Sequence, residues 1–128
     1  MKVLIVDGYN AIHKIPEIDS IMDESLDQAR SAITGLAKEY QRRIGGISEV
    51  FVVFDGQDEY RGLSLNKPNQ VFSRTGQGDR KVIRLAQDKS DKFHVVVVSD
   101  DNRVGNSCRA AGATVITVKK FYDAIKKY

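Results

Sequence analysis

Three short apolar runs constrain the fold of this chain more than any other feature of its 128 residues. They are Val3–Val6, Val50–Phe54 and Val95–Val98, and none of them alternates with polar residues. Continuous apolar runs rich in β-branched residues predict strands buried on both faces, as in a parallel sheet covered by helices. The first two runs lead directly into Asp-Gly and the third into Ser-Asp-Asp. Because open α/β sheets bind ligands beyond the carboxyl ends of their strands, an acidic functional edge is expected there.

Helical patterns alternate with these strands along the chain. The clearest follows Ser25 and Gln28, which have the spacing of a capping box, and it continues with apolar residues at three- and four-residue steps until Gly45. The remaining patterns predict helices that begin at Asp79, over 102–111 and around 121–128, strands over 70–74 and 114–118, and loops over 11–19 and 57–69.

Such alternation predicts a single α/β domain over residues 1–128, with a five-stranded parallel sheet between two layers of helices. The order of residues along the chain leaves the strand order open, although the first strand is expected to be central. If the first and fourth strands are neighbours, Asp7 and Asp100 face one another at the point where the strand order reverses. Asp55 would then lie one strand away, and Asp79 would lie at a helix N-terminus above the same edge.

Carboxylates that converge on one edge repel each other unless a cation neutralises them. A hard divalent cation, Mg²⁺ or Mn²⁺, suits such a group of oxygens. The chemistry that this predicts is metal-assisted hydrolysis of a phosphodiester. Three of these aspartates also have an ordinary structural interpretation: Asp55 as a turn residue, Asp79 as a helix N-cap, and Asp101 as a cap or a solvated side chain. Of the adjacent pair, Asp100 is the better candidate ligand.

Basic residues lie on either side of the expected edge, in a chain whose net charge is +3. A polyanion such as RNA would need cations around an acidic centre, although a solvated surface explains any single cluster equally well. Tyr9 and Tyr60 are placed to stack on an unpaired base, and Asn10 could orient a water or bind a phosphate. The three basic clusters are Lys38, Arg42 and Arg43; Arg61, Lys67 and Arg74; and Arg80, Lys81 and Arg84.

Composition indicates a cytoplasmic protein that is not bound to a membrane. No apolar run approaches membrane-spanning length, and the first residues lack the pattern of a secretory signal. The single cysteine, Cys108, excludes an internal disulfide and a cysteine-based zinc site, and it is expected to pack on a helix.

Four motifs together resemble a known family. They are Asp7-Gly8-Tyr9-Asn10, Val53-Phe54-Asp55-Gly56, Gly78-Asp79 and Val98-Ser99-Asp100. Over nearly the whole chain they are similar to the NYN domains of the PIN-like nuclease superfamily, and most similar to the bacterial YacP-like subgroup, which includes a ribosome-associated endoribonuclease.

The resemblance implies a PIN-like sheet with strand order 3-2-1-4-5 and divalent-metal-dependent cleavage of RNA. It implies catalytic metal ligands at Asp7, Asp79 and Asp100, with Asp55 nearby. One departure stands out, because family members usually carry acidic or polar residues where this chain has Gly76 and Arg80. Arg80 would either hold the scissile phosphate or mark a weakened metal site.

A metal-dependent endoribonuclease is therefore the leading hypothesis, and the alternative is an RNA- or ribosome-binding module of the same fold that does not cut. A phosphoacceptor receiver domain fits poorly because no aspartate ends the third strand, and a haloacid-dehalogenase-type phosphatase fits poorly because Tyr9 stands where its second aspartate would be. The residues expected to bind the RNA are Asn10, Tyr9, Arg80, Arg74, Arg61 and Arg84.

Overall fold

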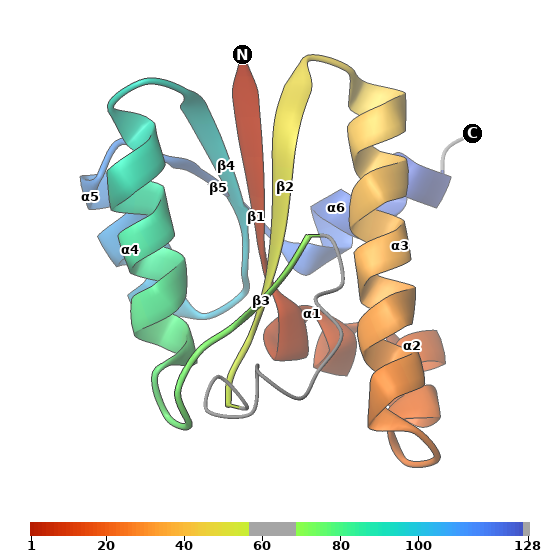
Figure 1. The fold of residues 1–128 in the computed structure, drawn as a ribbon. Coiled ribbons are helices and arrows are strands. Elements are labelled where there is room, and N and C mark those ends of the chain that lie inside the picture. The colour runs from red at the N-terminus through yellow and green to blue at the C-terminus, as the bar shows by residue number, and fades with distance from the viewer. Residues whose placement is uncertain (57–68, 127–128) are drawn as a thin grey trace.

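The computed structural model describes residues 1–56 and 69–126, and its centre is a parallel five-stranded sheet (Figure 1). The strand order is β3-β2-β1-β4-β5, which confirms both the predicted order and the central place of the first strand. The strands are β1 (Lys2–Asp7), β2 (Ile47–Phe54), β3 (Gln70–Phe72), β4 (His94–Val98) and β5 (Thr114–Ile116).

Helices cover both faces of the sheet and make the three-layer α/β fold that the sequence predicts. Helices α4 and α5 lie on one face, and α1, α2, α3 and α6 lie on the other (Figure 1). The helices are α1 (Gly8–Lys14), α2 (Pro16–Met22), α3 (Leu26–Ile44), α4 (Gly78–Ser90), α5 (Asn102–Ala110) and α6 (Val118–Lys126).

The core has two halves, one on each face of the sheet. Along β1, Leu4 and Val6 pack toward the layer of α3, whereas Val3 and Ile5 pack toward α4 and α5. All four side chains are fully buried, which is why the run contains no polar residue. Cys108 is buried in the second half, as expected for a residue that packs on a helix.

The predicted loop over 11–19 is wrong, because this stretch belongs to helices α1 and α2. Pro16 is not an interruption but the first residue of α2, where its missing N–H costs nothing and its fixed φ favours the helix. Ile12 and Ile18 bury their side chains in the core, so packing stabilises two helices that are short in isolation.

Smaller differences concern the ends of elements. The third strand stops at Phe72 rather than at residue 74, and the fifth stops at Ile116, so that Val118 begins α6. At the start of α3 the predicted cap is confirmed, since the Ser25 hydroxyl accepts a hydrogen bond of 3.2 Å from the N–H of Gln28.

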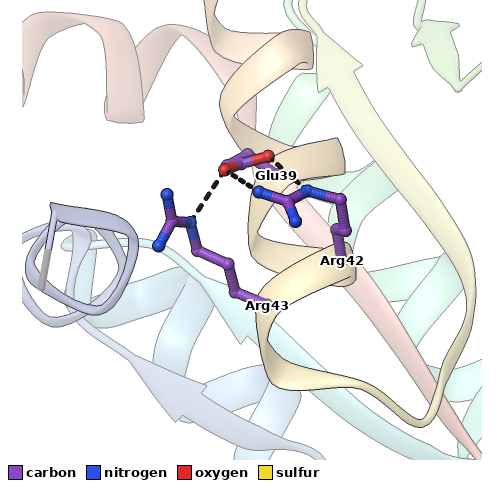
Figure 2. A network of polar contacts seen from close by, with 3 residues as sticks. All are labelled: Glu39, Arg42 and Arg43. Carbon is purple, nitrogen blue, oxygen red and sulfur yellow. Dashed lines mark hydrogen bonds and ion pairs between the residues drawn. The ribbon is translucent and has the colours of Figure 1, made fainter. Parts of the chain in front are cut away.

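The last turns of α3 carry a network of charged side chains on the surface (Figure 2). Glu39 accepts hydrogen bonds from Arg42 at 2.9 and 2.6 Å and from Arg43 at 2.8 Å. These two guanidinium groups lower the pKa of the Glu39 carboxyl to about 2. Two cations of the first basic cluster are thus already paired with a carboxylate of their own helix.

Candidate active site at the carboxyl edge of the sheet

Asp7 lies at the carboxyl end of the central strand, and the chain enters α1 at the next residue. Gly8 makes this tight passage possible. A Cβ atom at this position would lie 2.6 Å from the ring of Phe54 and 2.6 Å from the carbonyl oxygen of Val53. Only glycine allows so close an approach, which fixes the backbone of Asp7 against β2 at the reversal of strand order.

Ser99 holds the carboxylate of Asp7 in place. Its hydroxyl donates a hydrogen bond of 3.0 Å to Oδ2 of Asp7 and accepts one of 3.1 Å from the N–H of Asp101. The Ser99 residue is itself buried. Ser99 belongs to one of the family motifs, but the sequence did not predict that it would position Asp7. The sequence carried no signal for this role, because it depends on the register of the strands: Val6 pairs with Val98, which places Asp7 beside Ser99.

Three further aspartates lie close enough to act on Asp7. The pKa of Asp7 is raised from 3.8 to about 6, first because the carboxylate is partly buried and then because Asp79, Asp101 and Asp55 place negative charge around it. The hydrogen bond from Ser99 opposes this rise. Negative charge from three separate segments therefore gathers around the end of β1.

The two aspartates after β4 have different partners. Asp101 caps α5, since its Oδ1 accepts a hydrogen bond of 3.0 Å from the N–H of Val104, and it also acts on Asp7 by charge. Asp100 instead accepts a hydrogen bond of 2.9 Å from the N–H of Val118 at the start of α6. Asp101 therefore joins the candidate ligands, and the metal-binding role of Asp100 stays a prediction.

Asp55 and Asp79 are brought to this edge by a tight turn before α4. Oδ1 of Asp55 accepts a hydrogen bond of 2.7 Å from the N–H of Gly76, and a Cβ at Gly78 would lie 2.9 Å from that of Asp55. Asp55 thus stabilises the turn through this hydrogen bond, as expected of a turn residue. Asp79 is not the N-cap of α4, because that position belongs to Gln77, and it lies in the first turn.

Tyr9 and Asn10 both make contacts within the protein. The Tyr9 hydroxyl accepts hydrogen bonds of 3.0 and 2.8 Å from Arg30, and its ring lies 5.3 Å from that of Phe54. The Asn10 side-chain oxygen accepts one of 2.8 Å from the N–H of Asp100. Arg30, only 8% exposed, was missed by sequence reasoning, although a charged residue on the apolar side of α3 was a usable signal. Binding of RNA by Tyr9 and Asn10 stays a prediction.

Two cavities are lined by residues that neighbour these aspartates in the chain or include them. The first, about 350 Å³, is lined by three of the predicted RNA-binding residues together with Lys81: Arg74, Arg80 and Arg84. The second, about 330 Å³, lies on the side of β5 and is lined by Ser99, Asp100, Asp101, Arg109 and Lys119 among others. Arg61, Lys67 and Tyr60 fall outside the described residues.

A family model described as the YacP-like NYN domain matches residues 4–128. The chain belongs to the YacP-like NYN family. It is 32% identical over 92 residues to the uncharacterized protein YacP of Bacillus subtilis (strain 168), a match that covers 68% of this chain and 52% of that protein. In that match the chain spans about half the length of its curated relative.

Solved structures show the same fold. Two crystal structures of Rae1 (YacP) from Bacillus subtilis, one of a point mutant, match 98% of this chain with TM-scores of 0.79 and 0.76. The matches cover 76% and 74% of those chains, at 23% and 22% identity. Membership of the YacP-like NYN family supports a nuclease-like function related to RNA. None of the helices within the described ranges is long and apolar enough to cross a membrane.

The donor set of this NYN domain fits a hard cation. Within residues 1–56 and 69–126, no three histidine, cysteine, aspartate or glutamate side chains are grouped closely enough to hold a metal ion between them. Mg²⁺, however, is usually held by one or two carboxylates, with waters and substrate phosphates completing its shell. Asp7 is partly buried and feels the negative charge of Asp79 and Asp101, so its carboxylate is of the kind that such an ion takes, with a second one from either segment.

Proposed function

We propose that this NYN domain is a divalent-metal-dependent endoribonuclease that hydrolyses RNA phosphodiester bonds at the edge around Asp7. One observation carries the proposal: a partly buried carboxylate whose pKa is raised to about 6 amid three other aspartates. An arrangement of this kind destabilises the fold unless a bound cation compensates for it, and perturbed carboxylates of this kind gather at functional sites.

In this proposal Asp7 holds Mg²⁺ or Mn²⁺ together with one second carboxylate, from Asp79 or from Asp100 or Asp101 in the loop after β4, and Asp55 lies nearby. Waters and substrate phosphates would complete the shell of the ion. The metal, when bound, would lower the pKa of a water and stabilise the leaving oxygen. The protein supplies the positioning: Ser99 orients Asp7, Asn10 ties α1 to the loop after β4, and Asp55 anchors the turn before α4.

A second candidate is a module that binds RNA or a ribosome without cutting. The observation in its favour is the composition at the start of α4, where Asp79 is followed by Arg80 and preceded by Gly76 and Gly78. That helix contributes one carboxylate, and the Asp55 beside it is already hydrogen-bonded to the turn.

Cleavage of a labelled single-stranded RNA by purified protein separates the two candidates. The nuclease predicts that Mg²⁺ or Mn²⁺ supports cleavage, that chelation stops it, and that Asp7→Asn abolishes it with the fold intact. Asp123→Asn is a matched control, because Asp123 is exposed and pairs with Lys119 on α6. This variant should cleave the RNA as the wild type does. Binding of RNA without cleavage under all metal conditions would favour the second candidate.

A further inference from the structure

The cavity between β3 and α4 is unusual in its charge. Its wall contains four cations, Arg74 from the turn after β3 and Arg80, Lys81 and Arg84 from α4. Arg80 and Arg84 are four residues apart and therefore lie on one side of the helix, where like charges destabilise it by a few tenths of a kcal/mol. Among the described residues that line this cavity, none is acidic.

These four cations share one cavity wall, and among the described residues none of them has an acidic partner. On α3, by contrast, Arg42 and Arg43 are both paired with Glu39 (Figure 2). The cations of such a cluster repel one another, and a bound anion offsets that repulsion.

The second cavity, on the side of β5, shows the opposite arrangement. Asp100 and Asp101 line it and bring negative charge. Its Lys119 is paired with Asp123 at 2.7 Å, and Arg109 donates a hydrogen bond of 3.3 Å to Asn106. The cavity beside β5 includes Asp100 and Asp101 of the acidic edge, and the wall of the other cavity includes Arg80, the residue that follows Asp79. The two volumes are similar, so charge is what distinguishes the cavities for a polyanion.

We infer that the cavity between β3 and α4 binds phosphate groups of single-stranded RNA beside the cleaved bond, so that the strand leaves the acidic edge toward α4 and not toward β5. This inference rests on the proposed function for the identity of the polyanion. Gln77 adds a neutral hydrogen-bonding side chain to the wall and Phe72 an apolar surface. A concave space of about 350 Å³ accepts a flexible nucleotide, whereas a duplex presents its phosphates on a rigid convex surface.

Two double variants that remove equal charge provide the test. Arg80→Gln with Arg84→Gln changes the proposed cavity, and Arg109→Gln with Lys119→Gln changes the cavity beside β5. Binding of a labelled single-stranded RNA is measured by fluorescence anisotropy over a range of salt concentrations, in chelator, so that no cleavage occurs. Thermal melting checks that both variants are folded, and Arg84→Gln alone is the fallback if the first pair melts early.

Losing two phosphate contacts should make the slope of log affinity against log salt less steep by about 1.4. If the variant and the wild type bind alike at 1 M salt, the variant should then bind about 25-fold more weakly than the wild type at 0.1 M. The control pair should bind within about twofold of the wild type. Equal losses in the two pairs, or an unchanged slope in the first pair, would overturn the inference.

Two further arms identify the ligand and keep the proposals apart. Inorganic phosphate and a nucleoside monophosphate should compete only weakly with the RNA, and if either binds as tightly as the RNA the cavity serves a small phosphate instead. Because binding is measured in chelator, a wild type that never cleaves would refute the nuclease but leave this result standing.

Discussion

At the scale of single residues, the carboxylate of Asp7 is the group with the most unusual surroundings. Its pKa of about 6 lies above the ordinary 3.8, so the folded protein binds this proton more tightly than the unfolded chain does. The resulting penalty on stability is present above about pH 6 and disappears as the pH falls toward 4. At about 1.4 kcal/mol for each pKa unit, it amounts to roughly 2–3 kcal/mol.

Asp7→Asn should therefore stabilise the metal-free protein by about 2 kcal/mol at pH 7.5 and by little at pH 4. Urea unfolding of both proteins in chelator at the two pH values measures this difference. A variant less stable than the wild type at pH 7.5 would show that the Asp7 carboxylate supports the fold instead of opposing it.

Ser99 is a positioning residue, because it acts through Asp7. Ser99→Ala removes a hydrogen bond that lowers the pKa of Asp7, so the pKa of Asp7 should rise further. The expected stability loss is about 1 kcal/mol. The pH profile of cleavage distinguishes this role from a merely structural one, since its acidic limb should move to higher pH. Ser20→Ala, at an exposed site on α2, should leave the profile in place.

At the scale of elements, the junction of β1 and α1 depends on a glycine. Gly8→Ala would place a Cβ atom 2.6 Å from Phe54 and Val53, and should lower the free energy of unfolding by more than about 3 kcal/mol. Gly35→Ala is the matched control, because it lies inside α3 with nothing within 4 Å of its Cβ position. That variant should gain roughly 0.5–1 kcal/mol. Chemical denaturation of both would reveal the contrast, and equal effects would contradict it.

Elements also show where sequence reasoning succeeded and where it could not. The runs at Val3–Val6 and Val95–Val98 were predictable because burial on both faces leaves an unmistakable pattern. The helices over 8–22 were not, because Pro16 signals both a break and a first helical position, and packing decides between them.

At the scale of the whole molecule, the site depends on how distant segments meet. The sequence located the acidic edge, but the role of Ser99 follows from the register of β1 with β4, 92 residues apart in the chain. Likewise, the different partners of Asp100 and Asp101 depend on where α5 and α6 begin. Such contacts leave no local pattern, so only the folded arrangement reveals them.

The central claim is that the acidic edge around Asp7 binds a catalytic divalent cation. A crystal of the protein soaked in Mn²⁺, with anomalous scattering recorded, tests it most directly. We predict a peak within about 2.2 Å of an Asp7 carboxylate oxygen, close to a second carboxylate from α4 or the loop after β4, and absent in Asp7→Asn. Peaks only elsewhere on the surface, or no peak at saturating Mn²⁺, would contradict the metal-dependent nuclease.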